Sequence, residues 1–304
     1  MILVLVDGDP VAFEALTFAR RLGDVEAVAF DDVDLDGYAT RVHRVRAAGF
    51  NGLDGYAPVA WAQTIVELAP DVVVAPGTDR GHEVLAHVAA QLGAPLAANC
   101  VEARVDGDVY HLTRQRWGGS LLEEARLHGT PKLLTVAPHA VAAEPAGNAP
   151  AVVEDFVPSS LRDEHFQVRV ARREEPPAGV LQLDRARVVV GGGRGVGSAE
   201  GFAILEELAS LLGGAVGGSR VVTNLGWRPH SDQVGQTGAR IAPDIYIACG
   251  VSGAIQHWVG CKGAKRILAI NTDKDAPLVA KADYAVIGDL HEVVGAIVSE
   301  LRKH

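Results

Sequence analysis

Residues 217–258 read GGSRVVTNLGWRPHSDQVGQTGARIAPDIYIACGVSGAIQHW. Two glycine-rich turns flank a short apolar strand in this stretch, and the remaining positions hold hydroxyls, amides, an arginine and a histidine. Such polar side chains are poor core material, because burial without partners is costly, but they can grip a polar, planar, phosphorylated ligand. The stretch therefore predicts a strand-and-helix domain with a ligand site beside its strand ends.

On either side of this stretch, apolar strands alternate with helices. A strand at 187–190 runs into the glycine-rich residues 191–198, and a helix is expected at 199–212. Further buried strands are expected at 245–249, 266–270 and 284–287, and a final helix at 291–301. Continuous apolar strands between helices are typical of a parallel sheet covered on both faces. The pattern predicts a doubly wound, Rossmann-like domain.

The first half of the chain shows the same alternation. Strands are expected at 2–6, 27–30, 72–75 and 133–136, and helices at 11–22, 58–68 and 81–92, which predicts an α/β domain with a parallel sheet. Alternating residues between 103 and 112 predict a hairpin that turns at Asp106-Gly107.

A segment that combines charge, two prolines and a glycine, residues 174–179, separates the two halves. Such segments are typical of domain boundaries, so we expect domains at 1–178 and 179–304. The loop at 77–81 follows a strand and is expected to cap a helix more readily than to hold a nucleotide.

Composition excludes several classes of protein. The 304 residues are 48% hydrophobic, and 28 basic against 38 acidic residues give a net charge of −10, which disfavours nucleic acid and anionic membranes as partners. We expect residues 1–6 to form a first strand and not a signal peptide. Cys100, Cys249 and Cys261 show no Cys-x-x-Cys spacing, so a cytoplasmic protein with free thiols is expected, without a zinc site.

Three loops are candidates for the ligand site. In the first, Gly193 and Gly195 precede a helix start that would attract an anion, but Ser198 replaces the third glycine of the dinucleotide fingerprint. A phosphate site and a tight structural turn remain equally open there. In the second, residues 250–254 follow a strand and suit a pyrophosphate, with Gln256 and His257 one helical turn further on.

The third candidate combines Ser219-Arg220 with residues 233–238. A fixed arginine stabilises negative charge, and threonine and glutamine can satisfy the heteroatoms of a redox-active ring. The alternative is an ordinary loop with a surface arginine.

At these residues the chain resembles the alpha subunit of electron transfer flavoprotein. The matching segments are 217–220, 233–238, 241–257, 270–277, 282–284 and 288–290, so the resemblance covers residues 188–294 strongly, and a looser similarity extends into the first half. The resemblance implies that the second domain holds most of an FAD.

The resemblance also implies a role for each matching residue. Arg220 would lie beside the isoalloxazine ring and favour its reduced, anionic forms, Thr237 near N5 and O4, and His257 near O2. Ser219, Gln233 and Gln236 would complete the flavin shell. Val234, Gly235, Ile255 and Gln256 would also bind the cofactor. Ser252, Gly253 and Ala254 would face the phosphates and ribityl chain. The ADP end would fall to Arg194, Asn271, Asp289 and Leu290.

The same resemblance implies a heterodimer with a beta subunit that carries AMP, and one FAD per heterodimer. The pair would be an electron carrier of fatty acid beta-oxidation, without a catalytic nucleophile or acid–base group. It would accept electrons from flavin dehydrogenases such as acyl-CoA dehydrogenases and pass them to a membrane quinone reductase. Two alternatives are a subunit of an electron-bifurcating complex that oxidises NADH, and a non-redox nucleotide-binding scaffold.

Overall fold

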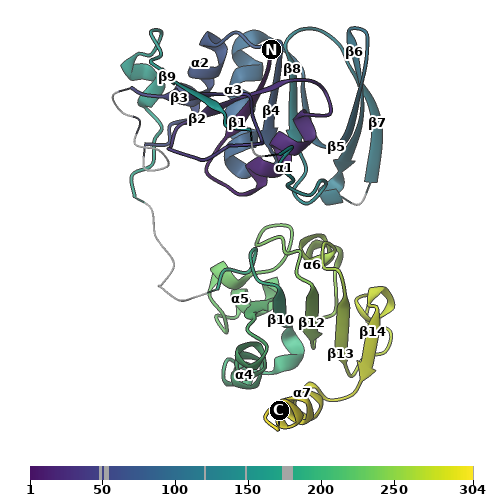
Figure 1. Cartoon of the computed structure of the whole chain (residues 1–304). Coiled ribbons are helices and arrows are strands. Elements are labelled where there is room, and N and C mark those ends of the chain that lie inside the picture. The colour runs from purple at the N-terminus through teal and green to yellow at the C-terminus, as the bar shows by residue number, and fades with distance from the viewer. Residues whose placement is uncertain (48–49, 51–54, 120, 148, 173–180, 304) are drawn as a thin grey trace. The chain divides into compact units, whose positions relative to one another are not determined.

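The computed structural model describes residues 1–47, 50, 55–119, 121–147, 149–172 and 181–303. It divides into two compact units, Met1–Glu174 and Glu175–His304. Each unit has helices packed on a β-sheet (Figure 1), which confirms the predicted α/β class. The boundary expected after residue 178 and the linker at 174–179 lie outside the described residues.

The first unit is built on a sheet with the strand order β7-β6-β5-β8-β4-β1-β2-β3-β9 in the described chain. The strand pairs from β5-β8 through to β3-β9 are parallel. The pairs β5-β6 and β6-β7 are antiparallel, so the sheet is mixed and not parallel throughout. The strands are β1 (Ile2–Val6), β2 (Val25–Ala29), β3 (Arg41–Val45), β4 (Val72–Pro76), β5 (Leu96–Asp106), β6 (Val109–Arg116), β7 (Leu121–Leu127), β8 (Lys132–Val136) and β9 (Val152–Phe156).

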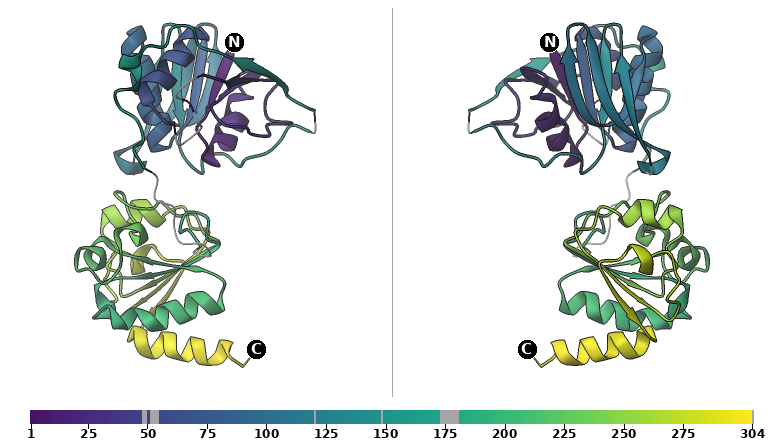
Figure 2. Two further views of the ribbon diagram at one scale, coloured as in Figure 1. Left: turned by 90° about the vertical axis from the view of Figure 1, so that its left-hand side faces the viewer. Right: turned by 90° about the vertical axis from the view of Figure 1, so that its right-hand side faces the viewer.

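In the part of the first unit that the structure describes, helices α1 (Val11–Ala19), α2 (Pro58–Glu67) and α3 (Asp79–Leu92) cover the two faces of the sheet (Figure 2). Successive strand residues point to opposite faces, so Val4 packs with α1, and Leu3 with α2 and α3. The helix expected at 11–22 is shorter than predicted, since α1 ends at Ala19. The Thr78 hydroxyl accepts a hydrogen bond from the Gly81 amide at 2.9 Å, which confirms that the 77–81 loop caps a helix.

The predicted hairpin is present, but its turn lies one residue later than expected. Asp106 pairs with Val109, so Gly107 and Asp108 form the turn. Gly107 has a φ of +57°, and a two-residue hairpin favours glycine or asparagine in that left-handed conformation.

Glu67, the last residue of α2, fastens the segment at 159–160 to the first unit. The backbone amides of Ser159 and Ser160 donate to its two carboxylate oxygens at 2.8 and 3.0 Å, and both serine hydroxyls donate as well. Partial burial raises the pKa of Glu67, but these four hydrogen bonds outweigh it and hold the pKa at about 2.

Glu67→Gln is expected to lower the free energy of unfolding by about 1 kcal/mol at pH 7. The effect is modest because Glu67 is partly exposed and solvent screens its charge. Because folding depresses this pKa, the carboxylate stabilises the fold above the ordinary pKa of glutamate. That contribution shrinks as the pH falls below the ordinary pKa of glutamate and is lost as the pH falls through about 2, so the difference between wild type and variant should narrow steadily over this range. Urea unfolding at several pH values measures the difference, with the exposed Asp24→Asn as the matched control. A difference that does not shrink between pH 7 and pH 2 would contradict this account.

The second unit contains a parallel sheet with the order β11-β10-β12-β13-β14. Helices α4 and α7 lie side by side on one face (Figure 2), and α6 packs on the other. The strands are β10 (Val188–Gly192), β11 (Ala215–Gly218), β12 (Ile245–Cys249), β13 (Ile267–Asn271) and β14 (Tyr284–Ile287). The helices are α4 (Ala203–Leu211), α5 (Arg220–Asn224), α6 (Ile255–Cys261) and α7 (Leu290–Leu301).

Two expectations for this unit need correction. The helix expected at 199–212 is divided into a 3₁₀ turn, Glu200–Phe202, and the α-helix α4. The strand at 284–287 was expected to be buried, but all four residues of β14 are exposed, because β14 is the edge strand of the sheet. No helix in the described residues has the length and apolar character needed to cross a membrane.

The strand order fixes where this unit can bind a ligand. β10 lies between β11 and β12, so the chain leaves β10 towards one edge and later continues towards the other. In open parallel sheets, the carboxyl ends of the strands at such a reversal leave a crevice that serves as a binding site. The loops after β10, β11 and β12 hold the candidate residues Gly193 and Gly195, Ser219-Arg220, and 250–254, and Asn271 lies at the end of β13.

Candidate functional site

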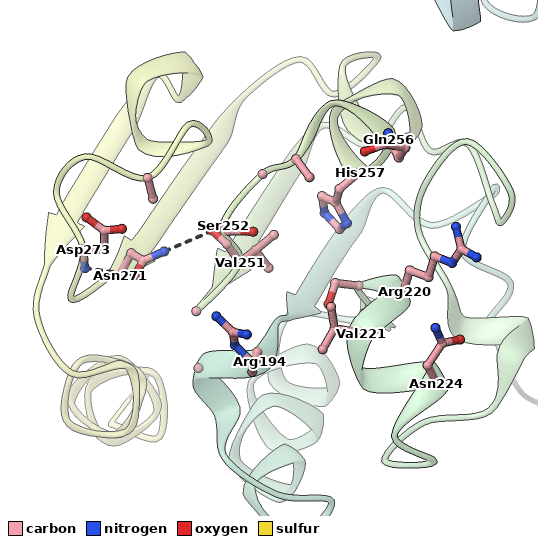
Figure 3. Close-up of a pocket in the computed structure, with 16 residues that line it drawn as sticks. Arg194, Arg220, Val221, Asn224, Val251, Ser252, Gln256, His257, Asn271 and Asp273 are labelled. Atoms are coloured by element: carbon pink, nitrogen blue, oxygen red, sulfur yellow. Dashed lines mark hydrogen bonds between the residues drawn. The ribbon is translucent and has the colours of Figure 1, made fainter.

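A pocket of about 520 Å³ lies at the carboxyl ends of these strands (Figure 3). It is formed by the loops after β10, β11, β12 and β13 together with the first turns of α5 and α6. Nine of the predicted cofactor-binding residues line it: Arg194, Ser219, Arg220, Ser252, Gly253, Ala254, Gln256, His257 and Asn271. The structure therefore brings the first two candidate loops and the Ser219-Arg220 part of the third to one place, although their contacts with a cofactor stay a prediction.

The loop after β10 packs tightly on the loop after β12. The Gly193 amide donates to the Cys249 carbonyl at 2.8 Å, and the Gly195 amide donates to the Gly250 carbonyl at 3.1 Å. A Cβ atom on Gly193 would lie 2.2 Å from the Gly250 carbonyl oxygen. Gly193 thus permits a close backbone approach, and Arg194 and Gly195 also line the pocket.

Positive partial charge gathers at the pocket from two helix starts. Ser219 and Ala254 are the N-cap residues of α5 and α6, and neither side chain caps its helix. The first backbone N–H groups of such helices remain available to an anion. The lining also holds Arg194 and Arg220 against a single acid, Asp273, so the pocket favours a negatively charged ligand.

The two arginines reach the pocket from different elements. Arg194 belongs to the turn after β10 and Arg220 begins α5, and Figure 3 shows their guanidinium groups extending in different directions. Both side chains are exposed, which leaves their charges available to a ligand.

His257 lies in the wall of the pocket and is only 6% exposed. Its Nε2 lies 2.8 Å from the Tyr246 hydroxyl, and its Nδ1 is buried without a hydrogen-bond partner among the described residues. Burial lowers the pKa of His257 to about 4, although a weak hydrogen bond with the backbone of Val234, outside ordinary hydrogen-bond geometry, acts in the opposite direction. The ring is therefore neutral at pH 7, with one nitrogen still to be satisfied.

The loop at 233–238 is held beside the pocket but does not line it. The Gln233 side-chain amide donates to the Thr237 hydroxyl at 3.0 Å, and the Thr223 hydroxyl lies 3.0 Å from the Gln233 oxygen. The backbone N–H of Gln236 donates to the backbone carbonyl of Gln256 at 2.8 Å, and the backbone N–H of Val234 donates to the backbone carbonyl of Gly218 at 2.9 Å. Because Thr237 accepts from Gln233, its own O–H remains a donor for another group.

Other predicted residues have structural partners of their own. Asn271 lines the pocket and donates to the Val251 carbonyl at 3.0 Å, which joins the loops after β13 and β12 (Figure 3). Asp289 caps α7, Leu290 lies in the core, and Ile255 is exposed outside the pocket lining. Their assignment to FAD, like that of Val234, Gly235 and Gln236, stays a prediction.

Seven lining residues are not among the predicted cofactor-binding residues, although three of them belong to the candidate loops: Gly195, Val221, Asn224, Gly250, Val251, Asp273 and Ala276. Val221 and Asn224 lie on α5, directly after the predicted Ser219-Arg220 pair. A helical projection from Arg220 would have found Asn224, because residues four apart share one face of a helix. Gly195 and Gly250 belong to the first two candidate loops, and the hydrogen bond between them places both in the lining.

Metal and thiol chemistry find little support in the described residues. No group of three or more His, Cys, Asp or Glu in them is arranged to hold a metal ion. Cys100, Cys249 and Cys261 are free and buried, which confirms the expectation of free thiols. Burial raises the pKa of each of these three thiols to about 12, so they are poor nucleophiles at neutral pH.

Each of the two units matches a known family of protein domains. Residues 182–262 match the model of the electron transfer flavoprotein FAD-binding domain, and residues 3–161 match that of the electron transfer flavoprotein domain. Among solved structures, a thiamine diphosphate-dependent 4-hydroxybenzoylformate decarboxylase of Rhodococcus jostii RHA1 aligns at 11% identity over 96% of this chain and 53% of its own. The TM-score of 0.27 is below the level that indicates a shared fold.

Relatives match over nearly the whole chain. The electron transfer flavoprotein subunit alpha of Syntrophomonas wolfei is 36% identical over 96% of this chain and 95% of its own length. The Mycobacterium tuberculosis protein of the same name is 37% identical over 96% and 93%, respectively. Protein FixB of Clostridium saccharobutylicum is 35% identical over 85% of this chain and 79% of its own. The chain belongs to the family of electron transfer flavoprotein alpha subunits.

Proposed function

We propose that this chain is the FAD-carrying subunit of a heterodimeric electron carrier. It would accept electrons from flavin dehydrogenases such as acyl-CoA dehydrogenases and pass them to a membrane quinone reductase. The observation that supports this most is the pocket at the β10–β12 crevice, most of whose lining falls within the segment that matches an FAD-binding domain.

The residues present fit FAD. A dinucleotide brings a pyrophosphate, and the uncapped start of α6 with Arg194 nearby offers N–H groups and positive charge for it. An isoalloxazine brings carbonyl oxygens and ring nitrogens, and the orphaned Nδ1 of buried His257 is a group that such a ring could satisfy. Bound FAD supplies the one- and two-electron chemistry, which protein side chains lack.

The chain itself would bind and orient FAD and set its electrostatic environment. Arg220 would place a permanent positive charge beside the ring, and Thr237 would donate the hydroxyl proton that Gln233 leaves free. His257 would stay neutral at pH 7 and offer a hydrogen bond near O2. None of these tasks requires a nucleophile or an acid–base group.

We further propose a beta subunit that packs against the Met1–Glu174 unit and carries AMP, with one FAD per heterodimer. The supporting observation is the match of residues 3–161 to an electron transfer flavoprotein domain.

A second candidate is a subunit of an electron-bifurcating complex that oxidises NADH. The similarity to Protein FixB favours it. The cofactor content of the partner subunit distinguishes the two candidates, because the bifurcating complex needs a second FAD where the simple carrier holds AMP.

The test is to co-express the chain with the partner encoded beside its gene and to record the visible spectrum during stepwise reduction. We expect a yellow heterodimer with one FAD that is reduced by an acyl-CoA dehydrogenase with its substrate. Reduction by NADH and two FAD per heterodimer would favour bifurcation. A preparation that stays colourless after FAD is added would reject both and leave the non-redox scaffold.

A further inference from the structure

A tyrosine outside the pocket lining contacts the buried histidine of the pocket wall. Tyr246 lies on the central strand β12 and is fully buried, and its Oη is 2.8 Å from Nε2 of His257. The two rings have centroids 6.0 Å apart and are tilted by 32°. Tyr246 therefore supports His257 from the core side of the pocket.

The sheet makes specific room for this phenol. A Cβ atom on Gly191 of the neighbouring strand β10 would lie 2.2 Å from Oη and 2.7 Å from Cζ of Tyr246. Gly191 thus leaves the space that the end of the tyrosine ring occupies. A phenylalanine would fill most of that space without a buried polar atom, so the hydroxyl is explained by its partner and not by packing.

The chemistry of the two groups decides which one donates. Burial raises the pKa of Tyr246 well above its ordinary value, so the phenol keeps its proton. A phenol is a better donor than acceptor, and the lone pair of a neutral imidazole is a good acceptor, so Oη donates to Nε2. The proton of neutral His257 then resides on Nδ1, the nitrogen that has no partner in the described residues.

We propose that Tyr246 is a positioning residue that selects the Nδ1–H tautomer of His257 and fixes its ring plane, so that the pocket offers a hydrogen-bond donor to a carbonyl oxygen of the ligand. This rests on the proposed function in one respect, namely that the carbonyl belongs to FAD. Removing the phenol hydroxyl would leave Nε2 unsatisfied and free the ring to change tautomer.

The test compares the heterodimer, labelled with ¹⁵N-histidine, as wild type, Tyr246→Phe and the control Tyr284→Phe, whose tyrosine is 61% exposed on β14. The His257 signals are identified by their loss in His257→Gln. Wild type and Tyr284→Phe should show a single Nδ1–H tautomer, and Tyr246→Phe should lose it. The reduced-to-oxidised ratio of FAD at fixed potential should fall roughly threefold to tenfold in Tyr246→Phe, as expected for one hydrogen bond.

A double-mutant cycle separates positioning from a general structural effect. In the His257→Gln background, Tyr246→Phe should have no further effect on the FAD ratio, and an independent, additive effect would overturn the proposal. So would an unchanged tautomer in Tyr246→Phe. If that variant does not fold, the wild-type spectrum decides, because an Nε2–H tautomer there contradicts the proposal. A chain that binds no FAD would refute the proposed function, while the tautomer measurement on the same chain still decides the role of Tyr246.

Discussion

Gly193→Ala is expected to abolish stable FAD binding and to lower the thermal midpoint of the Glu175–His304 unit. The new Cβ would lie 2.2 Å from the Gly250 carbonyl oxygen and 2.6 Å from the Cα of Val251. Both contacts are with backbone, so no side chain can rotate away, and the loops after β10 and β12 must separate. Overpacking of this kind costs about 3 kcal/mol. The same separation would widen the crevice between the two loops that line the pocket.

Calorimetry and the FAD content of the purified heterodimer measure both effects. Gly295→Ala is the matched control, since it makes the same chemical change in the same unit. Its Cβ would meet only Ile204 Cδ1, at an ordinary distance of 3.7 Å, within helix α7. Alanine is favoured over glycine in a helix by up to about 1 kcal/mol, so this control should be neutral or stabilising. Normal FAD content in Gly193→Ala would show that the loops tolerate separation.

Four of the five strands of the second unit could be predicted, because they are rich in apolar residues, but β11, which reads AVGG, was not expected because half of it is glycine. Residues 245–249 were expected as a strand and form β12 with the same bounds. The exposure of β14 could not be predicted, because the sequence of an edge strand can be as apolar as that of a buried central strand. Only the strand order places Tyr284 and Ile287 at an edge.

In the first unit, the strands that sequence analysis missed are more polar or lie at edges. β3 reads RVHRV and β9 reads VVEDF, with charged residues that pair across the strands, such as Arg44 with Asp155 at 2.6 Å. Charges that stabilise a strand through its neighbour resemble loop residues until the pairing is known. The sheet is mixed because β5 of the predicted hairpin pairs in parallel with β8 and antiparallel with β6, and β7 then adds a second antiparallel pair.

The site could be predicted in outline because the carboxyl ends of parallel strands converge. The residues that differ from the prediction depend on local geometry. The sequence places Asp289 after a strand, where its carboxylate could face a ligand. In the structure, that carboxylate accepts hydrogen bonds from the backbone N–H groups of His291 and Glu292 at the start of α7. Asn224 reaches the pocket only because α5 turns it onto the same side as Arg220.

Arg220→Ala is expected to lower the reduction potential of bound FAD by roughly 50–100 mV, the value for loss of one charge a few ångströms from the ring in a partly solvated site. Arg220 is exposed within the described chain and begins α5 at the pocket, so its charge is not already neutralised by a buried acid. Reduction adds negative charge, and a fixed cation stabilises the reduced state more than the oxidised state. Arg220→Lys keeps the charge and should retain most of the potential, although the planar fork is lost.

Arg194→Ala removes the same charge from the other side of the pocket and should act differently. Its place in the turn after β10 puts Arg194 with the loop expected at the ADP end, where charge does not change on reduction. The dissociation constant of FAD should rise roughly tenfold to a hundredfold, as for loss of a charged hydrogen bond, with the potential nearly unchanged. Potentiometry and FAD titration on both variants test this difference. Arg220→Ala should change mainly the reduction potential, and Arg194→Ala should change mainly the affinity for FAD. Equal shifts of potential in the two variants would mean that the isoalloxazine does not lie at the Arg220 side, and the orientation proposed for FAD would have to be reversed.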